Sequence, residues 1–219
     1  MKALVFYSSR LDLDHPLSIG LREMDLKLHA ESLIEFEALP FTCPNNTEFS
    51  WLFFTSPKAV RVYDEHCSFK GFKLAFLGEG TLRAKPEEVH ADFVGEGEVA
   101  EVAEAFKNVL GHEKVLFPCS KNSLQRIPKV LGHQAEVRFS YETKLKSNFF
   151  IPESDLYFFT SPSNVQSFFA KQKPKPGSAI MAMGESTQKE LLKFGFPSIT
   201  PNNYLPESQL EAIKEALKR

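Results

Sequence analysis

The chain has 219 residues, a length that suits one large domain or two small ones. Its 42% hydrophobic and 25% charged residues are typical of a globular protein with enough apolar material for a core. The net charge of −2 excludes the broad positive field of a nucleic-acid binder. No apolar run of about eighteen residues is present, so a membrane-spanning helix is not expected.

The cysteines and histidines indicate neither disulfides nor a metal. Cys43, Cys67 and Cys119 are odd in number, far apart and outside any Cys-x-x-Cys pair, so we expect no disulfide framework and no zinc site. Six scattered histidines form no His-Glu-x-x-His pattern. Residues 1–6 enter a short strand directly, without the longer apolar stretch of a signal peptide. We therefore expect a reduced, cytoplasmic protein.

Short apolar runs alternate with amphipathic segments along the chain. The runs have the form of parallel strands covered on both faces. These predicted strands are Ala3–Tyr7, Trp51–Thr55, Lys73–Leu77, Lys114–Pro118, Leu156–Thr160 and Ala179–Met183. The predicted helices are Pro57–His66, Glu98–Leu110, Leu124–Leu131, Ser163–Ala170, Thr187–Phe194 and Ser208–Lys218. This alternation predicts an α/β fold with parallel sheets and right-handed crossovers.

Two extended segments break the alternation. Residues 33–41 and 136–144 alternate apolar and polar side chains, and neither is followed directly by a helix. We interpret them as two linker strands, one leaving the first domain and one returning to it. The first domain is then discontinuous, with residues 1–35 and 145–219, and residues 37–140 form a second domain inserted into it.

An internal repeat is the strongest signal in the sequence. Trp51–Val60 reads WLFFTSPKAV, and Leu156–Val165 reads LYFFTSPSNV. A second matching pair follows at nearly the same spacing, with Gly-Glu-Gly-Thr at Gly78–Thr81 and Gly-Glu-Ser-Thr at Gly184–Thr187. A two-part match of this kind indicates a duplicated α/β unit.

Each copy of the repeat places Thr-Ser-Pro where a strand meets a helix. Ser56 and Ser161 suit the N-cap, and the proline after each suits the first helical position, so capping alone explains both serines. Yet open α/β sheets bind ligands at the carboxyl ends of their strands. Helix N-termini there offer free N–H groups to carboxylates or phosphates. With two such edges facing across a hinge, we expect a cleft for one large, multiply anionic ligand.

The motifs occur in a specific order along the chain. Phe-Thr-Ser-Pro stands at Phe54–Pro57 and Phe159–Pro162, Tyr-Glu-Thr at Tyr141–Thr143, and the Gly-x-x-Thr turn at Gly184–Thr187. With the inserted-domain layout, this order resembles the uroporphyrinogen-III synthase family over essentially the whole chain. The resemblance implies two flavodoxin-like parallel-sheet domains from an internal duplication, one inserted in the other and joined by two linker strands, in a monomer.

The resemblance also implies a reaction. The substrate is hydroxymethylbilane, a linear tetrapyrrole with eight carboxylates, which is cyclised with inversion of ring D and loss of water. The product, uroporphyrinogen III, belongs to haem and sirohaem biosynthesis. No metal and no organic cofactor are implied, because the pyrroles themselves drive the chemistry.

Site residues follow from matching positions in the family. Tyr141 matches the tyrosine that assists departure of the substrate hydroxyl, and a phenol with a pKa of about 10 can donate a proton at neutral pH. Interdomain packing is the other interpretation of Tyr141. Residues expected to bind substrate carboxylates are Ser56, Ser161, Ser163, Ser186 and Thr187. Arg10 is a candidate carboxylate clamp, and Ser120 with Asn122 is a weaker candidate at another strand exit.

Two other functions stay open on the residues alone. A two-domain α/β binding protein or sensor that closes on an anionic small molecule would share the hinge architecture. Only a phenol directed into the cleft, at Tyr141, favours an enzyme over such a sensor. A nucleotide-using transferase is disfavoured, because the chain has no Gly-x-x-x-x-Gly-Lys loop and Gly78-Glu79-Gly80 lacks the third glycine of a dinucleotide-binding turn.

Overall fold

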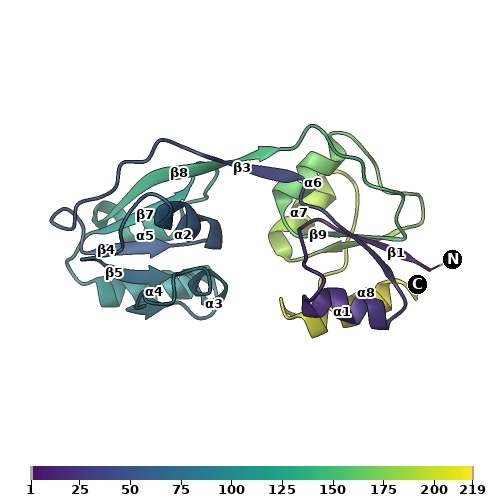
Figure 1. Cartoon of the computed structure of the whole chain (residues 1–219), viewed down its shortest axis with the longest axis horizontal. Helices are drawn as coiled ribbons and strands as arrows, with labels where there is room; N and C mark the ends of the chain where they lie inside the picture. The colour runs from purple at the N-terminus through teal and green to yellow at the C-terminus, as the bar shows by residue number, and fades with distance from the viewer. Residues whose placement is uncertain (1, 219) are drawn as a thin grey trace. The chain divides into compact units, whose positions relative to one another are not determined.

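The computed structural model describes residues 2–218, and the chain divides into two compact units. Unit 1 consists of Met1–Glu35 and Lys144–Arg219, and unit 2 of Phe36–Thr143. Each unit is built around a sheet with helices packed on it (Figure 1). The prediction of an α/β fold with parallel sheets is confirmed, whereas the duplication remains an interpretation of the repeat.

The sheet of unit 1 has the strand order β10-β9-β1-β2, with parallel pairing throughout. Its strands are β1 (Leu4–Tyr7), β2 (Lys27–Ala30), β9 (Leu156–Phe159) and β10 (Ala179–Ala182). Helices α1 (Pro16–Glu23) and α8 (Pro206–Ala216) cover one face, and α6 (Pro162–Phe169) and α7 (Glu185–Lys193) cover the other (Figure 1). The strand order reverses between β1 and β9, which makes this the topological switch point of a flavodoxin-like sheet.

The sheet of unit 2 has the order β3-β8-β7-β4-β5-β6. Its strands are β3 (Ile34–Ala38), β4 (Trp51–Phe54), β5 (Lys73–Phe76), β6 (Phe93–Val94), β7 (Val115–Ser120) and β8 (Ala135–Leu145). Its helices are α2 (Pro57–Asp64), α3 (Glu79–Leu82), α4 (Val99–Leu110) and α5 (Arg126–Leu131), followed by the 3₁₀ turn Gly132–Gln134. The switch point lies between β4 and β7, since the chain order reverses there.

The repeated strands β4 and β9 are buried at every position. Successive side chains of a strand point to opposite faces of the sheet, so a strand with helices on both faces must be apolar throughout. In β4, Phe53 packs against Phe106 of α4 on one face, and Phe54 packs against Tyr63 of α2 on the other. The paired phenylalanines of the repeat are therefore core residues of two opposite layers.

Several local features differ from the prediction. Helices α1 and α3 and the two-residue strand β6 were not predicted. Strand β2 is also absent from the prediction, because it is an edge strand whose residues are at most partly buried and carry no compact apolar run. Strand β7 continues past Pro118 to Ser120. The proline interrupts no ladder with β4, because that pairing involves only Val115 and Leu116 of β7.

The expectation that the chain holds no disulfide is wrong. Cys43 and Cys67 form a disulfide, with Cα atoms 5.6 Å apart and a sequence separation of 24. The segment after β3 returns to the end of α2, and sequence spacing alone did not indicate this approach. Cys119 is free, and burial raises the pKa of its thiol to about 11. The disulfide removes the cysteine argument for a reducing compartment.

Candidate active site

The main candidate residues lie at the carboxyl ends of parallel strands, at the switch point of each sheet. In unit 2, Ser56 follows β4 and Ser120 ends β7. In unit 1, Arg10 follows β1 and Ser161 follows β9. Open α/β sheets bind ligands in the crevice outside such a reversal of strand order. Each of the four residues is therefore at the binding edge of its own sheet.

Tyr141 on β8 is the centre of the site in unit 2. Its hydroxyl lies 3.0 Å from Ser56 Oγ, and either oxygen can be the donor. Ser120 pairs with Tyr141 in the register between β7 and β8, and its side chain acts to lower the pKa of the phenol. The tyrosine is only 5% exposed. The structure thus brings together three of the residues singled out from the sequence.

The environment keeps the phenol of Tyr141 protonated. Burial raises its pKa above the ordinary value of 10.0, and the hydrogen bonds from Ser56 and Ser120 act in the opposite direction without reversing the shift. Ser56 Oγ already accepts the N–H of Ala59 at 3.2 Å, so its own proton can be donated to Tyr141. In that arrangement the phenol proton is left for a ligand.

Phe36, a neighbour of Tyr141, and Lys58, which lies over the Phe36 ring, were not predicted as site residues. Phe36 of β3 packs edge-on against the phenol ring, with centroids 5.7 Å apart. The ammonium group of Lys58 lies 5.7 Å from the centre of the Phe36 ring. Lys58 is the second residue of α2, so it adds a positive charge at a helix start. The two copies of the repeat differ here, with Lys58 in one and Ser163 in the other. This difference could have indicated Lys58 from the sequence.

A polar turn closes the end of β7. The N–H of Asn122 donates to Ser120 Oγ at 3.2 Å, and Asn122 Oδ1 accepts the N–H of Thr143 at 3.1 Å. The hydrogen bond from Thr143 links this turn to β8 just beyond Tyr141. Asn122 therefore has a structural role in holding Ser120 beside the phenol.

Ser161 caps helix α6 in unit 1. Its Oγ accepts the backbone N–H of Asn164 at 3.3 Å and the side-chain Nδ2 of the same residue at 2.9 Å. The preceding Thr160 donates its N–H to Ser8 Oγ at 2.7 Å and its hydroxyl to the Ser8 carbonyl at 2.9 Å. These bonds join the ends of β1 and β9, so the switch point of unit 1 is fixed by side-chain hydroxyls.

The other candidates in unit 1 differ in exposure. Ser163 is half-buried in the first turn of α6, and Ser186 is exposed in the first turn of α7. Thr187 is only 2% exposed, and its N–H donates to the carbonyl of Gly184 at 3.0 Å. Ser186 is therefore better placed than Thr187 to meet a ligand. Arg10 is exposed, and no ion-pair partner for it is found among residues 2–218.

Tyr204 lies over the start of α7 and was missed from the sequence. A Cβ atom on Gly184 would come within 3.1 Å of the Tyr204 hydroxyl, so a larger residue there would require the tyrosine to shift by a few tenths of an ångström. The tyrosine itself is 73% exposed. It belongs to the loop before α8, where no spacing pattern connects it to the Gly-Glu-Ser-Thr turn.

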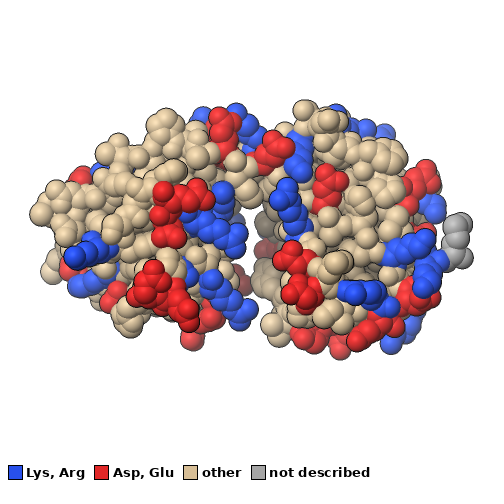
Figure 2. All heavy atoms as spheres, in the orientation of Figure 1, with Lys and Arg blue, Asp and Glu red and all other residues tan. Residues whose placement is uncertain are grey.

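Charge is mixed rather than segregated on the units. Acidic and basic side chains are interspersed on the face of each unit in Figure 2. A carboxylate ligand would therefore depend on local donors, such as helix N-termini and hydroxyls, rather than on a broad positive field. Among residues 2–218, no cluster of three or more His, Cys, Asp or Glu side chains could hold a metal ion. In the same range, no helix is long and apolar enough to span a bilayer.

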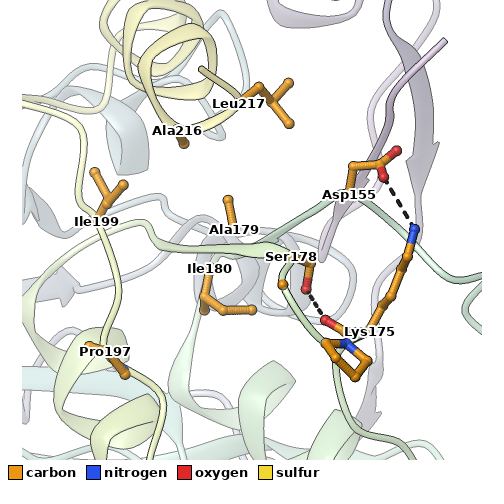
Figure 3. A pocket seen from close by; sticks show the side chains of 11 residues that line it. Asp155, Lys175, Ser178, Ala179, Ile180, Pro197, Ile199, Ala216 and Leu217 are labelled. Atoms are coloured by element: carbon orange, nitrogen blue, oxygen red, sulfur yellow. Dashed lines mark hydrogen bonds and ion pairs between the residues drawn. The ribbon is translucent and has the colours of Figure 1, made fainter. Parts of the chain in front are cut away.

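A pocket of about 580 Å³ lies at the opposite, amino-terminal edge of the sheet in unit 1 (Figure 3). Asp155 and Ser178 precede β9 and β10 there, and Lys175 pairs with Asp155 at 3.4 Å. A pocket of about 830 Å³ in unit 2 lies around Cys67 and the residues before β5. Neither pocket contains a candidate residue, so the hollows at these edges are separate from the candidate site.

Sequence comparison assigns the chain to a family. The sequence profile described as uroporphyrinogen-III synthase HemD matches residues 16–211. The chain belongs to the uroporphyrinogen-III synthase family. Members of this family are cyclising lyases of porphyrin biosynthesis. The matched range contains every candidate residue except Arg10.

Named relatives agree with the family match. A protein of Methanocaldococcus jannaschii named "Putative uroporphyrinogen-III synthase" is 24% identical over an alignment of 203 residues, and the alignment covers 80% of this chain and 82% of that protein. The crystal structure of uroporphyrinogen-III synthetase from Helicobacter pylori has a TM-score of 0.73 at 20% identity, covering 98% of this chain and 99% of that one. A mutant uroporphyrinogen III synthase from Thermus thermophilus has a TM-score of 0.60 at 15% identity, covering 99% of each chain. At these identities the two structures establish likeness of fold.

Proposed function

We propose that this member of the uroporphyrinogen-III synthase family cyclises hydroxymethylbilane to uroporphyrinogen III, with inversion of ring D and loss of water. The observation that best supports this reaction is the hydrogen bond between the Tyr141 hydroxyl and Ser56 at the carboxyl edge of the unit 2 sheet. A buried, protonated phenol held by a fixed partner suits a general acid. A protein that only binds an anion has no need of such a group.

The first step is departure of the terminal hydroxyl of the substrate. Tyr141 donates its phenol proton to that oxygen, the carbon–oxygen bond breaks, and water leaves. The lone pair of the adjacent pyrrole nitrogen stabilises the resulting azafulvene cation. Ser56 donates to the phenolate oxygen and so stabilises the negative charge that develops on Tyr141, in agreement with its lowering effect on the phenol pKa.

Ring inversion follows within the substrate. The substituted carbon of ring D attacks the electrophilic carbon and forms a spiro intermediate. The bond that joined the substituted carbon of ring D to the neighbouring ring then breaks. It re-forms at the unsubstituted α carbon of ring D. Loss of one proton, which Tyr141 can take back, restores the aromatic pyrrole. The protein mainly orients the chain for this closure, and such orientation can contribute about 7–11 kcal/mol.

The substrate carboxylates are assigned to donors that do not take part in proton transfer. They bind the hydroxyls and helix N-termini at Ser161, Ser163, Ser186 and Thr187, with Arg10 as the cationic clamp. Lys58 is added to this set from its position at the start of α2. The scheme uses no cofactor, because both the electrophile and the nucleophile belong to the substrate. A monomeric state and a cytoplasmic location remain predictions.

The test is to supply hydroxymethylbilane to the purified protein and to separate the uroporphyrin isomers after oxidation. We expect isomer III to predominate over the spontaneous isomer I. Tyr141→Phe should shift the product towards isomer I, while Tyr63→Phe should not. Tyr63 is a matched control because it is a buried tyrosine of the same unit whose hydroxyl donates only to the Ser68 carbonyl, at 3.2 Å. Isomer I alone, at the rate without enzyme and from folded protein, would contradict the proposal.

A further inference from the structure

Asn164 occupies an unusual place at the Thr-Ser-Pro junction of unit 1. It is the third residue of α6 and is only 3% exposed. Its Oδ1 accepts the backbone N–H of Leu33 at 2.8 Å, and its Nδ2 donates to Ser161 Oγ at 2.9 Å. The first copy of the repeat has Ala59 at the equivalent position, which offers no such group. The amide is therefore a feature of one unit and not of the shared scaffold.

The direction of each hydrogen bond between Leu33, Asn164 and Ser161 is fixed by the groups that form it. The N–H of Leu33 can only donate, so the oxygen of the Asn164 amide must face it. The nitrogen of that amide then faces Ser161 and can also only donate. Ser161 Oγ accepts this bond and the N–H bond from the Asn164 backbone, at 3.3 Å. Both of its acceptor positions are thus in use.

The only remaining capacity of Ser161 is donation of its own proton. No acceptor for that proton is present among residues 2–218. A carboxylate accepts hydrogen bonds and donates none, so it fits a hydroxyl in this state. A ligand group that donates, such as an ammonium, would find no free lone pair at Ser161. The hydroxyl of Ser161 is therefore held as a hydrogen-bond donor before any ligand binds.

We infer that Asn164 is a positioning residue, which holds the Ser161 hydroxyl as an outward hydrogen-bond donor for a substrate carboxylate. This inference rests on the proposed function, in which Ser161 binds such a carboxylate. Asn164 also connects that donor to Leu33, the residue just before β3. It acts through Ser161 and does not itself touch the reacting atoms.

Two variants separate polarity from packing. Asn164→Ala removes the amide, and we expect KM for hydroxymethylbilane to rise about fivefold with kcat unchanged, since one orienting hydrogen bond is lost. Asn164→Asp keeps the shape but accepts where the amide donated, so Ser161 turns its proton inward and KM should rise about tenfold or more. An aspartate at the third position of a helix is favoured by the helix dipole, so this variant should remain folded.

A double-mutant cycle tests whether Asn164 acts through Ser161. In the Ser161→Ala background, Asn164→Ala should cause no further rise in KM. Ser167→Ala is the matched control, because Ser167 is a buried residue of the same helix whose hydroxyl donates to the Lys146 carbonyl at 3.2 Å. That variant should lower thermal stability and leave KM unchanged.

The outcomes are distinguishable from those for the proposed function. If the wild-type protein forms isomer III but Asn164→Asp has the wild-type KM, the positioning role is wrong and the function stands. The same conclusion follows if the effects of Asn164→Ala and Ser161→Ala on KM simply multiply. If the wild-type protein forms no isomer III, the proposed function is wrong and the inference falls with it.

Discussion

Units 1 and 2 carry the same Thr-Ser-Pro junction but surround it with different chemistry. In unit 2, the hydroxyl of Ser56 contacts the phenol of Tyr141. In unit 1, the hydroxyl of Ser161 contacts the amide of Asn164. Both serines cap a helix in the same way, with proline at the first helical position. The capped helix start is shared by the two units, whereas the side chain that contacts the serine hydroxyl is different in each.

The neighbouring strands differ in the same sense. Val5 pairs with Leu156 of β9, and Val115 pairs with the equivalent Trp51 of β4. The residue five positions after each valine is Arg10 in unit 1 and Ser120 in unit 2. Unit 1 therefore presents the cation Arg10 and a serine hydroxyl, Ser161, that can only donate a hydrogen bond. Unit 2 presents hydroxyls around a protonated phenol. We interpret this difference as a division of roles, with proton transfer confined to unit 2 and most of the anion binding, apart from that of Lys58, in unit 1.

Removing the phenol should have the largest effect. In Tyr141→Phe, we expect kcat to fall about 100-fold or more with little change in KM, because a general acid acts only in the transition state. Initial rates of isomer III formation measure both parameters. A wild-type kcat in this variant would remove the distinction between the units, since unit 2 would then also serve binding alone.

The pH dependence gives a second check on Tyr141. An acid must be protonated to act, so activity falls as pH rises through its pKa. Burial raises that pKa above 10.0, so the loss of activity due to Tyr141 should have its midpoint above pH 10. An alkaline limb of kcat centred near neutral pH, and absent from Tyr141→Phe, would contradict this assignment.

The disulfide distinguishes the units by stability. Cys67→Ser should destabilise unit 2 by about 3–4 kcal/mol, because it releases a loop of 24 residues in the unfolded chain. Hydrogen exchange should accelerate in unit 2 and stay unchanged in unit 1. Cys43→Ser breaks the same bond and is the matched control, so the two variants should have equal effects. Unequal effects would mean that one cysteine also stabilises unit 2 by packing.

The two capping serines should alter different kinetic parameters. Each alanine variant loses an N-cap, which costs about 1 kcal/mol of stability in either unit. Beyond that, Ser56→Ala should lower kcat about tenfold through Tyr141, and Ser161→Ala should raise KM about tenfold through a lost carboxylate contact. If both variants change the same parameter, the proposed division between the units is wrong.

Regular features of the fold could be predicted from the sequence. Strands β4 and β9 are apolar at every position because both faces are covered, and a pattern of that kind is read directly from the residues. Edge strand β2 escaped prediction, since partial burial demands no apolar run. The disulfide between Cys43 and Cys67 depends on a loop path that no local pattern records.

The candidate site divides in the same way. Ser56 and Ser161 were found because a motif repeats, and Tyr141 because of a family resemblance. Phe36, Asn164 and the structural role of Asn122 required knowledge of which side chains meet in space. The repeat did contain two unused signals, because Lys58 and Ser163 differ at an otherwise similar junction, as do Ala59 and Asn164. Differences between copies of a repeat therefore deserve the same weight as their identities.

The amino-terminal edges of the two sheets provide the smallest expected effect. In unit 1, Asp155 Oδ2 accepts the N–H of Leu4 at 2.8 Å, and in unit 2, Asp92 Oδ2 accepts the N–H of Leu74 at 2.8 Å. The hydrogen bond from the N–H of Leu4 and, to a smaller extent, the ion pair with Lys175 (Figure 3) lower the pKa of Asp155 below its ordinary 3.8. The folded state therefore binds fewer protons than the unfolded one around that pH. This contribution to stability is complete above about pH 4 and is lost as the pH falls through the lowered pKa.

Asp155→Asn should therefore cost less than about 1 kcal/mol at neutral pH, because the carboxylate is 44% exposed and its ion pair is screened. Denaturant titrations at pH 7 and pH 3 measure the cost, which should be smaller at pH 3. Both Asp155→Asn and Asp92→Asn should retain wild-type kcat and KM, because these edges lie opposite the candidate site. A changed kinetic parameter in only one of them would mean that the difference between the units extends beyond the carboxyl ends of their strands.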